Sequence, residues 1–152
     1  MKFYNRQKEI ATLKAIEQNS SKSSQMTIMV GRRRVGKKTL LKRAFEKKSV
    51  LYFFVAKKNE VLLCEEFTRE VEDTLGVALG RFQNFASLFK AIRELSSERN
   101  FRLIIDEFQE FTSLNKYVFS DMQNIWDTYK DQGHMNLVLC GSIYSMMKRI
   151  FE

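Results

Sequence analysis

Residues 26–37, MTIMVGRRRVGK, decide the fold of this chain. The apolar run before Gly31 predicts a short buried strand, and Gly31-x-x-x-x-Gly36-Lys37 follows it directly. This spacing matches the first seven positions of Walker A, a loop in which glycines let backbone N–H groups point at phosphate oxygens. A helix predicted over residues 37–48 would present its positive N-terminus to the same phosphates. We therefore predict a nucleotide-binding P-loop domain.

The eighth position of this motif departs from the pattern. Walker A has Ser or Thr there, whose hydroxyl binds Mg²⁺, but this chain has Lys38 and places Thr39 one residue later. One residue is a rotation of ~100° on a helix, so Thr39 is expected to reach the α-phosphate and not the metal. Lys38 puts a cation near the place where Mg²⁺ belongs. We hypothesise that nucleotide binds while metal coordination, and with it hydrolysis, is weakened.

A second apolar strand ends in two carboxylates. Residues 103–107 read LIIDE, which is the Walker B pattern. Asp106 would hold Mg²⁺, directly or through water, and Glu107 would act as general base on the attacking water. Alternation along a strand predicts that the two side chains point in opposite directions. An acidic turn at the end of a strand is the simpler interpretation of the same residues.

Ser142 follows a further apolar strand, residues 136–140. Its hydroxyl is expected to contact the γ-phosphate or the lytic water. An N-cap of a short helix over residues 143–151 is an equally good interpretation of this serine and is compatible with the first.

Strands and helices alternate along the whole chain. Strands are predicted over residues 26–30, 50–56, 101–106 and 136–140, and helices over 3–18, 37–48, 60–75, 84–98, 115–131 and 143–151. Asn59 is predicted to cap the third helix and Gly76 to end it. Continuous apolar strands between helices are typical of a parallel sheet covered on both faces. We predict one α/β domain over residues 1–152, a three-layer α/β/α P-loop core with a mainly parallel sheet.

Positive charge is concentrated in the first third of the chain. Residues 1–50 hold 14 Lys or Arg but only three acidic residues, whereas the remainder is close to neutral. This asymmetry indicates an anion site at one end of the domain. A solvated basic face is the alternative for the lysines that flank the loop.

Composition argues against several other classes of protein. Cys64 and Cys140 lie in apolar stretches without metal-ligand spacing, and His134 is the single histidine, so we predict buried free thiols and no zinc site. No apolar run approaches the roughly 18 residues of a transmembrane helix. The start of the chain lacks the apolar core of a signal peptide. These features favour the cytoplasm and no membrane partner.

Four segments together resemble a known family. They are residues 3–10 (FYNRQKEI), 30–37 (VGRRRVGK), 105–109 (IDEFQ) and 139–142 (LCGS). The chain resembles the prokaryotic, archaeal and bacterial, ATPases of the AAA+/STAND group, whose P-loop reads Gly-Arg-Arg-Arg-x-Gly-Lys-Thr. The resemblance covers nearly the whole chain. The triple arginine and the Asp-Glu-Phe-Gln strand end are its specific parts.

The resemblance implies an ATPase that binds ATP or ADP with Mg²⁺ at the carboxyl ends of strands ordered 1-4-3-2. It implies that the nucleotide-binding residues are Asn5, Arg6, Gly31, Arg32, Arg33, Arg34, Val35, Gly36, Lys37, Lys38 and Thr39. Of these, Asn5 and Arg6 belong to a motif near the adenine. It also implies Lys37, Glu107 and Ser142 as catalytic residues and Asp106 as the metal ligand. The three arginines of the loop are candidates for partner contacts too, although a solvated loop tip explains them equally well.

The resemblance also implies parts that the predicted domain lacks. Proteins of this group continue into a fifth core strand and a helical lid, often followed by further domains. The core is therefore expected to be truncated before strand five, without lid arginines.

Two other functions remain open from the sequence. One is a basic nucleic-acid-binding module, which charge alone supports because no DNA or RNA motif is present. The other is a nucleotide-dependent regulatory switch that does not hydrolyse. A protein partner or self-association is compatible with all of these functions. The preference for adenine over guanine rests on the resemblance.

Overall fold

The computed structural model describes residues 24–30, 49–129, 132–142, 147 and 149–150. The predicted helices 3–18 and 37–48, and most of the predicted helix 143–151, lie outside these described residues. So do Asn5, Arg6 and the whole phosphate loop, Gly31–Thr39.

The described strands form one parallel sheet. They are β1 (Gln25–Val30), β2 (Val50–Phe54), β3 (Phe101–Asp106) and β4 (Met135–Gly141). Their order is β1-β4-β3-β2, and every neighbouring pair is parallel. This confirms the predicted α/β P-loop-like fold and the order 1-4-3-2. The strand bounds differ from the predicted ones by at most two residues.

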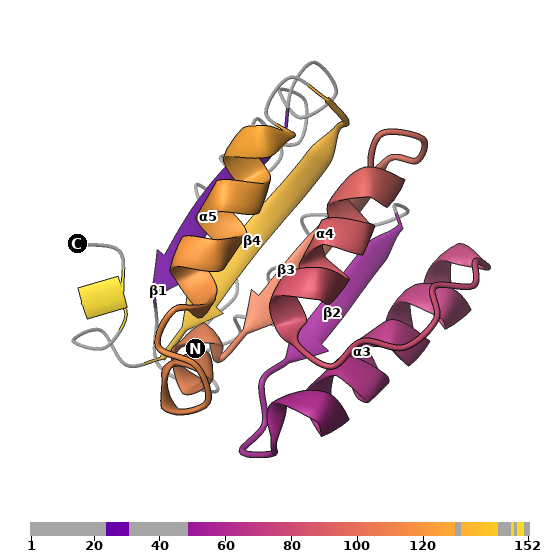
Figure 1. Cartoon of the computed structure of the whole chain (residues 1–152). Helices are drawn as coiled ribbons and strands as arrows, with labels where there is room; N and C mark the ends of the chain where they lie inside the picture. Colours follow the sequence, from indigo (N-terminus) through magenta and orange to yellow (C-terminus); the bar gives the residue numbers. More distant parts are fainter. Residues whose placement is uncertain (1–23, 31–48, 130–131, 143–146, 148, 151–152) are drawn as a thin grey trace, which may run out of the picture.

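Three helices lie side by side across one face of the sheet (Figure 1). They are α3 (Glu60–Leu75), α4 (Phe85–Leu95) and α5 (Val118–Thr128). The helix predicted over 84–98 ends earlier, because Ser96 caps it. The helix predicted over 115–131 is shorter at both ends, and a 3₁₀ helix that the sequence pattern did not predict, η2 (Phe108–Ser113), precedes it.

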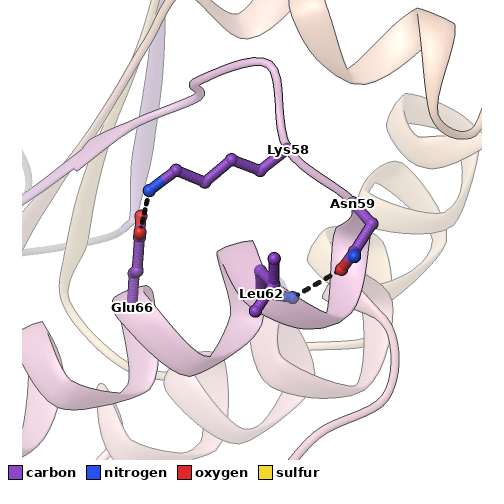
Figure 2. Close-up of polar contacts among 4 residues, drawn as sticks. All are labelled: Lys58, Asn59, Leu62 and Glu66. Carbon is purple, nitrogen blue, oxygen red and sulfur yellow. Dashed lines mark hydrogen bonds and ion pairs between the residues drawn. The ribbon is translucent and has the colours of Figure 1, made fainter.

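The first of these helices has the ends that the sequence predicts. The Asn59 side chain accepts a hydrogen bond of 2.9 Å from the backbone N–H of Leu62, which satisfies one of the helix's unpaired donors. Gly76 ends the helix in the left-handed conformation, with φ 66°. Figure 2 shows the cap beside a surface ion pair between Lys58 and Glu66, which joins the preceding loop to the second turn of the helix.

An aromatic core fills the space between the sheet and these helices. Phe53 of β2 stacks on Phe67 of α3 with ring centroids 4.3 Å apart. Phe85 of α4 lies 4.8 Å from Phe111 of η2, so the 3₁₀ helix after β3 is anchored in the same cluster. Each of these side chains is buried. Strands β3 and β4 are buried at every position, as expected for central strands of a parallel sheet.

A buried cation ties the helix layer to the amino end of the sheet. Arg93 of α4 is 1% exposed. Its guanidinium donates to the Ser24 hydroxyl (2.9 Å), the Ser96 hydroxyl (3.2 Å) and the backbone oxygen of Tyr129 (2.7 Å). It also lies 4.4 Å from the centre of the Trp126 ring. Burial lowers the pKa of Arg93 to about 10.

Both cysteines are buried and free, which confirms that part of the sequence prediction. Burial, and secondarily the charge of Glu60, raises the pKa of Cys64 to about 12. Within the described ranges, no helix combines the length and the apolar character needed to cross a membrane.

Candidate functional site

The parallel sheet brings three chain segments together at the carboxyl ends of its strands, which we call the carboxyl edge. Val30, the last residue of β1, pairs with Gly141 of β4, and Ile105 of β3 pairs with Leu139. Asp106, one residue further along, therefore reaches the level of β4 just before Ser142. Ligands of open α/β sheets bind at this carboxyl edge.

Asp106 is held at this edge by two donors. The backbone N–H of Glu107 donates to Asp106 Oδ1 at 2.9 Å. The hydroxyl of Tyr52, from the neighbouring strand β2, donates to Asp106 Oδ2. The carboxylate is 6% exposed. One donor is the residue that follows Asp106 and the other comes from the neighbouring strand, so together they fix the orientation of the carboxylate plane.

Glu107 adopts a backbone conformation that is rare for a side chain of its size. Its φ is 56° and its ψ is 41°, in the left-handed region, and the residue is 2% exposed. Non-glycine residues in this region cost of order 1 kcal/mol and cluster at functional sites. The strand ends at Asp106, so the predicted alternation does not extend to Glu107. The left-handed turn sets the direction of this carboxylate instead.

The Glu107 carboxylate accepts hydrogen bonds from two directions. The Ser142 hydroxyl donates to Glu107 Oε2 at 2.9 Å. The Gln109 side-chain amide donates to the same oxygen at 2.5 Å. The predicted sensor Ser142, which follows β4, is therefore in direct contact with the predicted base Glu107, which follows β3.

Gly141 leaves room for this arrangement. A Cβ at this position would lie 2.6 Å from Gln109 Oε1 and would collide with the side chain of Met147. Both Gln109 and Met147 are buried. A side chain at this position would therefore displace the ends of Gln109 and Met147, and glycine leaves both in place.

The electrostatics of the edge keep the Tyr52 phenol protonated. Burial raises the pKa of Tyr52, and the hydrogen bond and charge of Asp106 raise it further. Cys140 and Glu107 act in the same direction. Tyr52 therefore remains a hydrogen-bond donor to Asp106 over the range in which proteins are stable.

The donor set at this end of the sheet fits Mg²⁺. Asp106 and Glu107 offer carboxylate oxygens, and Ser142 offers a hydroxyl. Among the described residues, no three His, Cys, Asp or Glu side chains gather into a metal site on their own. Mg²⁺ is typically held by one or two protein carboxylates together with substrate phosphates, so a site of this kind is enough.

Of the residues predicted for the site, the structure brings together Asp106, Glu107 and Ser142. The predicted nucleotide-binding residues lie outside the described ranges, and β1 ends at the same edge directly before them. Two further residues of the edge had no predicted role, Tyr52 and Gln109. Gln109 belongs to the Asp-Glu-Phe-Gln segment, so its position in the motif was the available signal. Tyr52 had none, because its contact depends on strand pairing.

Solved structures with this fold include proteins from archaea and from animals. The ORC2 protein of Aeropyrum pernix, in its ADPNP–ADP complexes, has a TM-score of 0.69 at 18% identity, over 96% of this chain and 43% of that one. A Walker-type ATPase of Pyrococcus abyssi also has a TM-score of 0.69, at 17% identity, over 95% of this chain and 47% of that one. Drosophila ORC bound to DNA has a TM-score of 0.61 at 13% identity, over 93% and 38%.

Sequence comparison gives the family. A protein of Methanocaldococcus jannaschii, itself uncharacterised, is 26% identical over 145 residues, which are 95% of this chain and 30% of that protein. The chain thus spans less than a third of this relative. Residues 3–152 match the family model of an ATPase domain found predominantly in Archaea. With this match over nearly its whole length, the chain belongs to that archaeal ATPase domain family.

Proposed function

We propose that this chain is the ATP-binding core of an AAA+/STAND-type ATPase. One observation carries the proposal: β1, β4 and β3 are paired so that their carboxyl ends lie together, with Asp106, Glu107 and Ser142 at the ends of β3 and β4 and Val30 at the end of β1. Membership of an ATPase domain family supports it. So does the ORC2 structure with ADPNP and ADP.

The phosphate loop supplies the binding energy in this proposal. Gly31 and Gly36 let the backbone turn so that its N–H groups face phosphate oxygens, and Lys37 adds a full positive charge at the β- and γ-phosphates. Arg32–Arg34, Val35, Lys38 and Thr39 complete the loop, and Asn5 and Arg6 are proposed to lie near the adenine.

Asp106 is the proposed protein ligand of Mg²⁺. Its carboxylate is nearly buried and oriented by two donors, which suits a cation that demands regular geometry. When bound, Mg²⁺ would neutralise charge on the phosphates. Lys38 occupies the sequence position that contributes a hydroxyl in Walker A, so we expect weaker metal binding than in proteins with the complete motif.

Glu107 is the proposed general base. A base must lie within hydrogen-bond reach of the water that it deprotonates. In the structure, Glu107 Oε2 accepts from Ser142 and Gln109, two uncharged donors that hold the carboxylate at the strand end. Ser142 is proposed to contact the γ-phosphate or the water from the adjacent strand.

Calorimetric titration with ATP, ADP and GTP, with and without Mg²⁺, tests nucleotide binding. We expect ATP and ADP to bind, and Lys37→Ala to weaken binding at least tenfold. Lys90→Ala is the matched control, because Lys90 is exposed on α4, away from the carboxyl edge. If the unaltered chain binds none of these nucleotides, the proposal is wrong.

Restoring the Walker A hydroxyl tests the hydrolysis step separately. Lys38→Thr is expected to increase phosphate release from ATP, whereas Lys57→Thr, in the exposed loop after β2, should leave it unchanged. An unaltered turnover in Lys38→Thr would show that the departure at this position does not limit the reaction. Tight binding of ATP and ADP without turnover in either protein would instead favour a nucleotide-dependent switch.

Nucleic acid is a second candidate ligand, which the charge distribution favours. Residues 1–50 carry 14 Lys or Arg and three acidic residues. A distant structural relative, Drosophila ORC, is seen bound to DNA. Binding of duplex DNA should then fall steeply as salt rises. Affinity that is weak at low salt would remove this candidate and leave the nucleotide proposal untouched.

A further inference from the structure

Tyr52 contacts the site from a strand that holds none of the predicted site residues. It lies in the middle of β2, where its register partner is Ile104 of β3. Paired residues of neighbouring parallel strands share a face, and so do residues two apart on one strand. Tyr52 and Asp106 therefore lie on the same face, and the phenol reaches along β3 to the carboxylate at its end.

The hydroxyl, and not the ring alone, makes this contact. The neighbouring positions of β2 are Leu51, Phe53 and Phe54, so the residues next to Tyr52 on this strand are apolar or aromatic side chains that carry no hydroxyl. A phenylalanine at position 52 would fill nearly the same volume. What it would lack is the donor to Asp106 Oδ2.

The two bonds to Asp106 act together. One oxygen accepts the backbone N–H of Glu107 and the other accepts the Tyr52 hydroxyl. An ionised carboxylate has about four acceptor positions, and these bonds occupy at least one position on each oxygen and so fix the carboxylate plane. Groups that orient metal ligands in this way typically change metal affinity by about 10- to 100-fold when they are removed.

We infer that Tyr52 is a positioning residue, which orients the Asp106 carboxylate for the Mg²⁺ of a bound nucleotide. The inference rests on the proposed function and adds a residue to it. Tyr52 acts through Asp106 and has no contact of its own with the nucleotide. Removing its hydroxyl should therefore weaken metal binding and leave metal-free nucleotide binding unchanged.

The test is the variant Tyr52→Phe, with Tyr129→Phe as matched control. The Tyr129 hydroxyl also donates to a carboxylate, Glu94 Oε1 at 2.7 Å, but on the exposed surface at the far end of the helices. Affinity for ADPNP is measured calorimetrically in EDTA and at rising Mg²⁺ concentration. Mn²⁺ binding to the nucleotide complex is followed by electron paramagnetic resonance. Thermal unfolding records whether each variant is folded.

We expect Tyr52→Phe to raise the Mg²⁺ and Mn²⁺ concentrations for half-saturation about tenfold. Its ADPNP affinity in EDTA should match that of the unaltered chain, and Tyr129→Phe should match it in both measurements. In an Asp106→Ala background, adding Tyr52→Phe should cause no further change in metal dependence, because the residue through which Tyr52 acts is gone.

Other results overturn the inference. If Tyr52→Phe leaves the metal concentration for half-saturation unchanged, the role of the hydroxyl is purely structural. If that concentration falls, the hydroxyl competes with the metal for Asp106. A loss of ADPNP affinity in EDTA would show that Tyr52 acts on the nucleotide directly. These outcomes leave the proposed function standing. If the unaltered chain binds no ADPNP, the proposed function fails and the inference fails with it.

Discussion

Near the amino end of the sheet the buried charges among the described residues include the guanidinium of Arg93, whereas at the carboxyl end they include the carboxylates of Asp106 and Glu107. At both ends these charges are contacted by hydroxyl, amide or backbone groups of the described residues. Arg93 is also covered by Trp126, and it joins α4 to α5 and to the start of β1. The carboxylates are held by side chains at a strand edge, one of them on a strained backbone. The comparison teaches that the buried charge at the amino end connects helices to the sheet, whereas the hydrogen bonds at the carboxyl end orient two carboxylates.

The largest expected effect is at the carboxyl end. Glu107→Gln keeps the shape of the side chain but removes its capacity as a base, and we expect ATP turnover to fall by a factor of about 10² to 10⁴. Nucleotide affinity should be retained, because the proposed phosphate loop is unaltered. Phosphate release and calorimetry measure the two quantities.

Glu110→Gln is the control for this change, since Glu110 lies on η2, three residues beyond the proposed base. Its turnover should equal that of the unaltered chain. If Glu107→Gln turns over ATP as fast as the unaltered chain, Glu107 is not the base, and the carboxyl end no longer differs from the amino end in function.

The second effect belongs to the amino end. Arg93→Ala removes a large buried side chain that packs on Trp126 and makes three hydrogen bonds, and we expect it to lower the free energy of unfolding by about 2–5 kcal/mol. The affinity of the folded fraction for ATP should not change. Denaturant unfolding with and without ATP measures both effects.

Arg81→Ala provides the reference, because Arg81 is exposed and its loss should change stability by less than about 0.5 kcal/mol. A variant of Arg93 that unfolds like the Arg81 variant would show that the buried cation contributes little to connecting these elements.

Gly141→Ala tests both properties at once, because it introduces a packing change next to Gln109, which contacts the proposed base Glu107. The added methyl would meet Gln109 and Met147, and overpacking of this kind costs about 1–3 kcal/mol. We also expect reduced turnover, since Gln109 contacts Glu107. Gly76→Ala is the matched substitution: it strains a left-handed residue in open space and should destabilise without changing turnover of the folded protein. A Gly141 variant with full turnover would show that Gln109 has no part in holding Glu107.

The smallest effects are expected in the loop that leads from β2 into α3. Asn59→Ala removes the helix cap and should cost about 1 kcal/mol. Glu66→Gln removes the partner of Lys58 and should cost well below 1 kcal/mol, because both side chains are 43% exposed. Unfolding at low and high salt separates them: the second effect should vanish at high salt and the first should persist.

The sequence predicts the frame of this domain well where a local signal exists. Strand β3 has the predicted bounds, and Asn59 and Gly76 end α3 as expected, because caps depend on one side chain and one backbone conformation. The sheet order came from a family resemblance, since periodicity alone carries no information about which strands are neighbours. Helix α5 was predicted too long because the apolar spacing in the sequence continues beyond the residues that are helical in the structure.

The site is predictable only in part, for a physical reason. Asp106 and Glu107 are adjacent in sequence and form a motif, whereas the bond from Ser142 to Glu107 joins residues 35 positions apart. Tyr52 donates to Asp106 across 54 positions, and nothing in an aromatic strand indicates which carboxylate a tyrosine will meet. The left-handed turn at Glu107 could not be predicted either, because glutamate rarely adopts it.

The place of β4 has a consequence for how the domain comes into being. This strand is the last of the described strands in the chain, yet it lies between β1 and β3 and pairs with both. Among the described strands β1 pairs with β4, so during synthesis this pairing cannot be complete until residue 141 has left the ribosome. In a nascent chain released earlier, the proposed phosphate loop and the acid pair would both be present in the sequence, but the strand that joins β1 to β3 in the sheet would be missing.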